Sequence, residues 1–262
     1  MSLNAVKLTA EEIESPADKE NICAPIAQMP PPKLALVVPT LREAENIRIV
    51  LDRIRQNLDP LEFAYEIIVV DDDSRDGIDT IVQEIAATDP RVRILVRTGE
   101  RGLGSAVLYG WRHTAAEVLG VIDADLQHPP EVLPELWKAA ESGTDVVLAS
   151  RYAPRGGLEN WHPARHLLSR MMIWLTYPLQ KPGIHVKDPM AGFFLVRRSC
   201  LKDIELHNRG FKILLEILVK GNVRSVREVP FTFGPRRAGT SKASLRVGLE
   251  YFALLYRLWR EG

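Results

Sequence analysis

The chain is organised around one segment, Val118-Leu119-Gly120-Val121-Ile122-Asp123-Ala124-Asp125-Leu126-Gln127-His128-Pro129-Pro130. Its apolar first half, rich in β-branched residues, predicts a buried strand that ends in two aspartates. In extended geometry alternate side chains share a face, so Asp123, Asp125 and Gln127 are expected to point the same way. The two prolines then end the strand, and Glu131 opens an amphipathic helix.

The aspartates give this stretch a chemical meaning. In open α/β sheets, ligands bind in the crevice beyond the carboxyl ends of the strands. Hard oxygen ligands crowded at such a place suit Mg²⁺ or Mn²⁺, and these ions complete their shell with substrate phosphates. The stretch therefore predicts a metal–phosphate site. The alternative interpretation is a solvated acidic turn.

Strand and helix patterns alternate through residue 150, which predicts an α/β fold with right-handed crossovers and helices on both faces of a parallel sheet. Acidic residues follow the second and fourth strands, at the same end of that sheet, and Thr40 is expected to cap the first helix. The predicted strands are 34–39, 66–70, 92–96, 118–122 and 145–149, and the predicted helices are 43–57, 78–87, 105–116 and 131–142.

The pattern is less regular after Ser150, and residues 1–33 are predicted to form a tail outside the core, with room for a short helix. The later segments are predicted as helices at 163–179, 211–219 and 245–259, strands at 192–197 and 223–229, and a loop at 233–242 that is rich in glycine and basic residues.

Composition excludes several classes of protein. With 34 basic and 34 acidic residues among 262, the chain has no net charge, which argues against a general nucleic-acid binder. Two cysteines provide no disulfide framework and fit a reducing compartment. No run approaches the ~18 apolar residues of a membrane span. The stretch 167–179 could instead lie in a membrane surface, although aromatic residues in such helices more often belong to the core.

Three further clusters are candidates for substrate contacts. Asp71-Asp72 could bind a ribose or base, the alternative being a helix cap by Asp73 or Ser74. The glycines of 99–104 lack the context of a nucleotide-binding fingerprint, so they predict a loop that passes close to a ligand or a helix. The loop that carries Arg236 and Lys242 could close over a diphosphate, the alternative being a solvated basic surface.

Several blocks occur together in a characteristic order over residues 34–259. They resemble those of the GT-A inverting glycosyltransferases of glycosyltransferase family two and, more narrowly, of the dolichol-phosphate (polyprenol-phosphate) mannose synthases. The blocks are Val38-Pro39-Thr40-Leu41-Arg42-Glu43-Ala44-Glu45-Asn46, Val69 to Gly77, Gly102-Leu103-Gly104, Asp123 to Pro129, Ser150-Arg151-Tyr152, Gly156-Gly157 with Trp161, Arg165 and Ser169-Arg170, Asp188 to Phe194, and Arg236 with Gly239 to Lys242.

The resemblance implies a Rossmann-like GT-A fold, in which residues 34–262 form one domain. Residues 34–150 would be its nucleotide-sugar half and 151–262 its acceptor half. It also implies GDP-mannose as donor, a polyprenyl or dolichyl phosphate as acceptor, Mg²⁺ or Mn²⁺ as cofactor, and a peripheral location on the cytoplasmic side of a membrane. The implied donor-binding residues are Pro39, Leu41, Glu43, Val70, Asp72, Asp123, Ala124, Asp125, Gln127, Arg151, Arg236 and Lys242. Among these, Asp125 and Gln127 would bind the metal, and Asp125, Arg236 and Lys242 would be catalytic; Arg165, Ser169 and Arg170 would bind the acceptor phosphate.

Some positions depart from the family pattern. Leu41 stands where an aromatic residue is usual, Asp73 replaces a glycine or asparagine, and Met171-Met172-Ile173 replaces small residues and asparagine. Two other functions stay open: a glucosyltransferase that uses UDP-glucose and a polyprenyl phosphate, and a non-catalytic module that binds a nucleotide sugar.

Because a phosphate monoester, with a second pKa near ~6, is largely a dianion at neutral pH, transfer would need no strong general base and would proceed by one in-line displacement with inversion.

Overall fold

The computed structural model describes residues 5–7, 31–99, 101–154, 156–158, 163–207, 212–234 and 245–261. Its strands are β1 (Ala5–Lys7), β2 (Leu34–Thr40), β3 (Tyr65–Asp71), β4 (Val92–Val96), β5 (Val118–Val121), β6 (Val146–Ser150), β7 (Gly157–Leu158), β8 (Phe194–Arg197), β9 (Glu205–His207), β10 (Val226–Pro230) and β11 (Thr232–Phe233). Its α-helices are α1 (Ala44–Leu58), α2 (Ile78–Ala86), α3 (Leu103–Arg112), α4 (Leu133–Glu141), α5 (Pro163–Trp174), α6 (Ile213–Lys220) and α7 (Leu245–Glu261).

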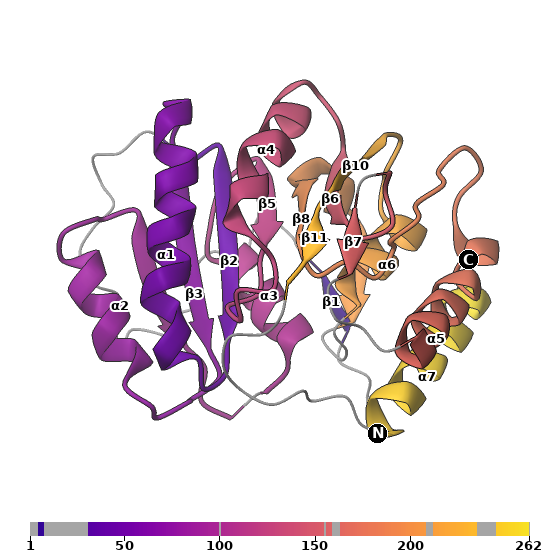
Figure 1. The fold of residues 1–262 in the computed structure, drawn as a ribbon, viewed down its shortest axis with the longest axis horizontal. Helices are drawn as coiled ribbons and strands as arrows, with labels where there is room; N and C mark the ends of the chain where they lie inside the picture. The colour runs from indigo at the N-terminus through magenta and orange to yellow at the C-terminus, as the bar shows by residue number, and fades with distance from the viewer. Residues whose placement is uncertain are drawn as a thin grey trace.

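A seven-stranded sheet with the order β10-β6-β8-β5-β2-β3-β4 forms the centre of the fold (Figure 1). Neighbouring strands are parallel except at β8, which is antiparallel to both β5 and β6. The predicted α/β fold with a mostly parallel sheet is therefore confirmed. The five strands predicted before residue 150 are all present, and so are the four helices between them, with ends shifted by a few residues.

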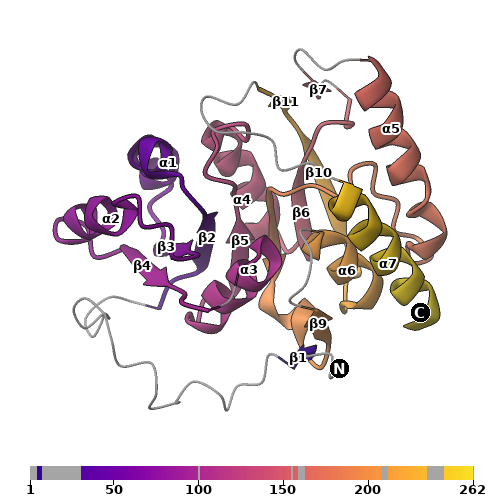
Figure 2. The same cartoon turned by 90° about the horizontal axis from the view of Figure 1, so that it is seen from below.

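Helices cover both faces of the sheet, as the alternating pattern predicts. Alternate residues of β2 and β3 point to opposite faces, so Leu36 and Val38 belong to one core and Val37 to the other. The first core packs against α1, α2 and α4, and the second against α3 and α6 (Figure 2). Gly110 lets α3 approach the sheet closely, because a Cβ atom there would lie 2.7 Å from a methyl group of Val37.

The helices α5 and α7 lie side by side beyond the β10 edge of the sheet (Figures 1 and 2). A third core of Ile173, Leu215, Tyr251 and Leu258 joins them to α6, and the Tyr251 hydroxyl donates a 2.5 Å hydrogen bond to the Met172 carbonyl. The helix predicted at 163–179 is shorter than expected, because α5 ends at Trp174 and a 3₁₀ turn follows over Tyr177–Leu179. No helix among the described residues has the length and apolar character needed to cross a membrane.

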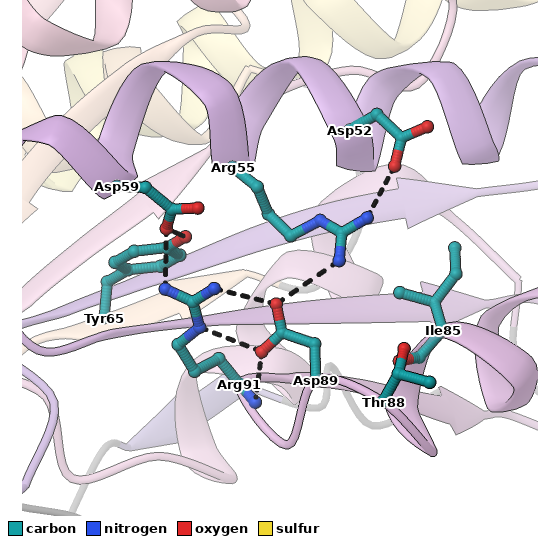
Figure 3. A network of polar contacts seen from close by, with 8 residues as sticks. All are labelled: Asp52, Arg55, Asp59, Tyr65, Ile85, Thr88, Asp89 and Arg91. Atoms are coloured by element: carbon teal, nitrogen blue, oxygen red, sulfur yellow. Dashed lines mark hydrogen bonds and ion pairs between the residues drawn. The ribbon is translucent and has the colours of Figure 1, made fainter.

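An ion-pair network lies at the end of the sheet where β3 and β4 begin (Figure 3). Arg91, just before β4, pairs with Asp89 at 2.8 Å and with Asp59 at 2.6 Å, while Asp59 also accepts a 2.5 Å hydrogen bond from the Tyr65 hydroxyl at the start of β3. Hydrogen bonds from Arg91 hold the pKa of its own guanidinium above the usual value. Arg55 of α1 joins the same cluster through Asp89. Because these residues lie where strands begin, we assign them to the scaffold.

The amino-terminal segment is described only in part. Residues Ala5–Lys7 form β1, which pairs antiparallel with β9, so this part of the predicted tail is a strand rather than a helix. The rest of that prediction, apart from residues 31–33, lies outside the described residues. The prediction that Thr40 caps the first helix was wrong. Thr40 is the last residue of β2, its hydroxyl donates to Asp71, and Glu43 directly precedes α1.

Candidate functional site

The carboxyl ends of β2, β3, β5 and β6 meet at one edge of the sheet, because these four strands run in the same direction. Most predicted donor residues lie on or just after these ends. Pro39 and Val70 are buried register partners in β2 and β3. Leu41, Asp72 and Arg151 directly follow β2, β3 and β6, and Asp123, Ala124, Asp125 and Gln127 follow β5.

The acidic stretch after β5 is a turn, not extended strand. Strand β5 ends at Val121, and Leu126 has a φ of +61°, in the left-handed region. The expectation that alternate side chains share one face therefore rested on the wrong backbone geometry. The turn nevertheless joins the two predicted metal ligands, because the Gln127 backbone N–H donates to Asp125 Oδ1 at 3.1 Å. Asp125 is only 7% exposed, which argues against a freely solvated acidic turn.

Both ends of this turn are held in place by neighbours. The Gln127 side chain donates from Nε2 to the Gly234 carbonyl at 3.1 Å, which ties the turn to the end of β11. The His128 ring packs against the rings of Phe193, Phe231 and Phe233, with centroid distances of 5.2 to 5.8 Å. The predicted metal–phosphate site is therefore bordered by the aromatic side chains that pack around His128.

Asp123 and His128 lie against the backbone of Gly192. The Nδ1 atom of His128 is 3.3 Å from Asp123 Oδ2, but it is buried and forms no hydrogen bond within the described residues. A Cβ atom at Gly192 would lie 3.0 Å from that same carboxylate oxygen and 3.4 Å from the His128 ring. Glycine at 192 thus leaves room for both side chains.

Arg151 is held by the fully buried carboxylate of Asp188. Its Nε donates to Oδ2 at 2.8 Å, its Nη2 donates to Oδ1 at 2.7 Å, and its backbone N–H donates to Oδ2 at 3.1 Å. Burial lowers the pKa of Arg151, but the hydrogen bonds and the charge of Asp188 outweigh it, so the pKa is raised. Arg151 is therefore a fixed cation at the end of β6.

Asp71 and Asp72 are both buried and have different partners. Asp71 accepts from the Ser74 backbone N–H at 2.8 Å, which closes the turn after β3. Asp72 pairs with buried Arg97, whose Nε donates to Oδ1 at 2.8 Å, and its Oδ2 accepts from the Gly102 N–H at 2.8 Å. The glycine loop thus contacts Asp72, and its predicted approach to a ligand stays a prediction. The alternative caps at Asp73 and Ser74 were wrong, because Gly77 directly precedes α2.

A pocket of about 780 Å³ lies between the start of α1 and the turn after β3, and neither Asp71 nor Asp72 lines it. Glu43, a predicted donor residue, lies in its wall, and so do Arg42, Asp73 and Arg101. The wall carries both carboxylates and guanidinium groups, so the pocket can accept and donate hydrogen bonds. Leu41 is half-buried, but it does not line this pocket.

The predicted acceptor residues lie on α5. The Ser169 hydroxyl accepts a 2.9 Å hydrogen bond from the hydroxyl of Tyr152, the neighbour of Arg151, so this part of α5 is joined to the end of β6. Arg170 is exposed. The side chain of Arg165 lies outside what the structure describes, as do the predicted donor residues Arg236 and Lys242 and the whole of the loop at 235–244.

Sequence reasoning missed two charged groups of this site. Asp188 belongs to a block that resembles the family, but the sequence predicted no role for it, and it predicted none for Lys212. Lys212 precedes α6, and its Nζ lies 3.5 Å from the Met190 carbonyl. Burial and nearby Arg151 lower the pKa of Lys212 to about 8, although Asp188 and Asp123 act in the opposite direction. A single lysine before an apolar helix carries no sequence signal of such a setting.

Metal ligands at this edge are few. The described residues contain no group of three or more His, Cys, Asp or Glu side chains able to hold a metal ion. Asp125 and Gln127 would supply a carboxylate and an amide oxygen, which are hard donors suited to Mg²⁺ or Mn²⁺. Such a sparse set fits an ion whose remaining ligands are waters and substrate phosphates.

The model of the family described as glycosyl transferase family 2 matches residues 35–205. The chain is 43% identical over 229 residues to the dolichol-phosphate mannosyltransferase of Pyrococcus furiosus, covering 87% of this chain and 64% of that relative. It is 37% identical over 235 residues to the dolichol-phosphate mannosyltransferase of Saccharomyces cerevisiae, covering 86% of each. The chain thus spans less than two thirds of the length of the Pyrococcus relative.

Solved structures agree on the fold. Glucosyl-3-phosphoglycerate synthase from Mycobacterium tuberculosis, in complex with Mn²⁺, UDP-glucose and phosphoglyceric acid, superposes with a TM-score of 0.61 at 18% identity, covering 87% of this chain and 79% of that one. This likeness concerns the fold alone. Together with the family match and the mannosyltransferase relatives, it leads to one conclusion: the chain belongs to glycosyl transferase family 2.

Proposed function

We propose that this protein transfers mannose from GDP-mannose to a polyprenyl phosphate such as dolichyl phosphate, with inversion at the anomeric carbon. The observation that carries the proposal is the 37% and 43% identity to two dolichol-phosphate mannosyltransferases. The matched range 35–205 contains Asp72, Asp125 and Arg151 of the candidate site. Both halves, 34–150 and 151–262, contribute side chains to that site, so we propose that they act as one catalytic unit.

The donor would lie along the carboxyl edge of the sheet. Its nucleoside would occupy the side formed by Pro39, Leu41, Glu43, Val70 and Asp72, and its ribose and diphosphate would meet Asp123, Ala124 and Asp125. The fixed position of Arg151 supports a role in holding the donor phosphates, because a guanidinium held by a buried carboxylate is oriented before substrate binds. Arg236 and Lys242 remain predicted as the cations that neutralise the departing diphosphate.

A divalent cation fits Asp125 and Gln127. Asp125 Oδ1 and the Gln127 backbone are joined by a hydrogen bond, and the Gln127 Nε2 is directed to Gly234, so the amide oxygen is the end of that side chain able to ligate. When bound, Mg²⁺ or Mn²⁺ would neutralise charge on the diphosphate leaving group. The Mn²⁺ complex of the mycobacterial glucosyl-3-phosphoglycerate synthase, which shares this fold, supports the proposed ion.

The acceptor brings its own nucleophile. A phosphate monoester has a second pKa near ~6, by analogy with phosphoserine, so it is largely a dianion at neutral pH. The protein therefore needs no strong general base, and its work is to position two anionic substrates and stabilise the leaving group. Ser169, Arg170 and Arg165 are our candidates for the acceptor phosphate, and the bond between Ser169 and Tyr152 supports their closeness to the end of β6.

The acceptor is a lipid, and the outer faces of α5 and α7 support contact with a membrane surface. Large apolar side chains are exposed on both helices, including Trp174 at 68% and Trp259 at 70% exposure. On each helix the exposed residues recur at helical spacing and form one outward stripe: Leu167, Leu168, Met171 and Trp174 on α5, and Phe252, Tyr256 and Trp259 on α7. We propose that this apolar stripe lies in the interface of the membrane that carries the acceptor.

A radiolabel transfer assay tests the proposed function. Purified protein would receive labelled GDP-mannose, GDP-glucose or UDP-glucose, each with dolichyl phosphate, in Mn²⁺ or in EDTA. We expect metal-dependent transfer from GDP-mannose alone. Transfer from UDP-glucose alone would keep the mechanism and overturn the donor, whereas binding of a nucleotide sugar without turnover would favour a non-catalytic module.

A further inference from the structure

Lys212 lies in a cluster of charged groups at the candidate site. Its Nζ is 3.5 Å from the Met190 carbonyl, two residues beyond Asp188, and its electrostatic neighbours are Arg151, Asp188 and Asp123. By surface area the residue as a whole is only partly buried. Lys212 therefore lies beside the Arg151–Asp188 pair.

This position is unfavourable for a lysine in the absence of a ligand. Burial removes water from the ammonium group, and the guanidinium of Arg151 repels it, so the pKa of Lys212 falls to about 8. Asp188 and Asp123 offset part of this repulsion, and an oxyanion of a substrate that contacts both Lys212 and Arg151 would relieve more of it. A lysine beside a candidate site, with a pKa perturbed by burial and by a specific charged neighbour, is a candidate functional residue.

The surroundings identify the class of anion. On one side, Asp123 belongs to the turn that carries the predicted diphosphate and metal ligands. On the other, Arg151 adjoins Tyr152, whose hydroxyl donates to Ser169 among the predicted acceptor residues. Phosphate groups of both proposed substrates would therefore come within this neighbourhood, and both present the same oxyanion chemistry.

We propose that Lys212 binds a phosphate group of a substrate, either the donor diphosphate or the acceptor monoester, as a partner of Arg151. The proposal rests on the proposed function for the identity of the substrates, but it requires only that a phosphate ligand binds here. The lysine would hold the phosphate by a charge-assisted hydrogen bond and share its negative charge with Arg151.

The experiment compares Lys212→Met, Lys212→Arg and wild type. Kinetics give KM for GDP-mannose and for dolichyl phosphate, and calorimetry gives Kd for GDP and for farnesyl phosphate. We expect Lys212→Met to raise KM and Kd for one of the two phosphate ligands by about tenfold or more, and Lys212→Arg to recover part of that loss. The ligand that is affected identifies whether donor or acceptor phosphate binds Lys212.

Lys220→Met is the matched control. Lys220 is the last residue of α6, the helix that Lys212 precedes, and it pairs with Glu216 at 3.1 Å and Glu261 at 2.6 Å, so its loss should lower stability and leave both ligand constants unchanged. Unchanged constants for Lys212→Met in an active enzyme would overturn the proposal for Lys212 alone. If wild type transfers no sugar but Lys212→Met still loses phosphate binding, the proposal stands and the mannosyltransferase function falls. Absence of GDP and farnesyl phosphate binding by wild type would overturn both.

Discussion

Arg151 and Asp188 are joined by two parallel hydrogen bonds, from Nε to Oδ2 at 2.8 Å and from Nη2 to Oδ1 at 2.7 Å, with the aspartate completely buried. The pair connects the end of β6 to the segment that leads into β8, and it fixes the direction of the Arg151 side chain at the candidate site. Its two members lie 37 residues apart in the chain, so the site is assembled by the tertiary fold.

Breaking the Arg151–Asp188 pair should destabilise the folded protein. Asp188→Asn leaves a buried guanidinium without its counter-charge, so we expect the free energy of unfolding to fall by about 3–5 kcal/mol. Urea denaturation measures it. Glu84→Gln is the matched control, because the Arg48–Glu84 pair is more than half exposed and its loss should cost no more than about 1 kcal/mol. Equal losses in the two variants would contradict the structural importance of the buried pair.

Asp125→Asn should abolish metal-dependent transfer without unfolding the protein. Loss of the carboxylate weakens the proposed metal site, and we expect kcat/KM to fall at least about a hundredfold. The control is Asp79→Asn on the exposed face of α2, which should keep full activity. Turnover by the Asp125 variant at the wild-type rate, with the same response to EDTA, would remove Asp125 as a metal ligand.

The lowered pKa of Lys212 in the folded protein predicts that the free energy of unfolding depends on pH. Its pKa is lowered to about 8 in the folded protein, against about 10.4 in an unfolded chain. Below pH 8 both states bind the proton, and the folded state carries the full cost of the buried charge. Between pH 8 and about 10.4 the unfolded state binds more protons, so stability rises with pH as this cost disappears.

Lys212→Met removes that cost at every pH. The variant should therefore be more stable than wild type at pH 7, and its advantage should shrink between pH 8 and about 10.4. Taking the difference between the two proteins at each pH cancels the other titrating groups. A difference that stays constant from pH 7 to pH 10 would show that the pKa of Lys212 is not lowered by folding.

Gly192→Ala tests the close approach to Asp123. The added Cβ would lie 3.0 Å from Asp123 Oδ2, so the carboxylate must move by a few tenths of an ångström. We expect roughly a tenfold loss in kcat/KM for the donor, since small displacements in a site reduce rate strongly. At Gly157 the same substitution meets Thr232 at an ordinary 3.6 Å, so Gly157→Ala should behave as wild type. A Gly192 variant with wild-type kinetics would show that the position of Asp123 does not matter.

Replacing both exposed tryptophans, Trp174→Ala with Trp259→Ala, should weaken binding to lipid vesicles. Both side chains are about 70% exposed, so their loss should hardly change the unfolding midpoint. Flotation with vesicles containing dolichyl phosphate measures the binding, and the exposed Val96→Ala is the control on the opposite edge of the sheet. Wild-type protein that fails to float with or without dolichyl phosphate would overturn the proposed membrane contact.

Hydrophobic patterning predicted the order of strands and helices up to residue 150, because each buried strand there is a short apolar run bounded by turn residues. It could not reveal that β8 runs antiparallel, since the same apolar residues serve a strand in either direction. The turn over Asp123–Gln127 was also mistaken for strand, because alternation of acidic residues mimics an extended segment while Leu126 adopts a positive φ.

The sequence likewise revealed some residues of the candidate site and not others. Side chains that follow strand ends, such as Asp72, Asp125 and Arg151, could be found because parallel strands bring their carboxyl ends together. Lys212 and Asp188 reach the site from segments that contain no such signal, and only the three-dimensional fold brings them beside Arg151. Family resemblance named roles for the first group and was silent on the second.

The position of β8 also determines when the sheet can close during translation. Strands β2 to β5 can pair with one another as they leave the ribosome, but β6 has only β8 and β10 as neighbours. The last residue of β10 follows that of β6 by about 80 residues, or roughly 4–16 s at ~5–20 residues per second. Until β8 is synthesised, the nascent chain carries an apolar segment, Val146–Ser150, with two unpaired backbone edges, and the edge that pairs with β10 stays open until the end of that interval. We expect chaperones to bind the growing polypeptide most strongly at this stage, so mutations that weaken β8 should reduce the yield of folded protein more than they reduce its stability.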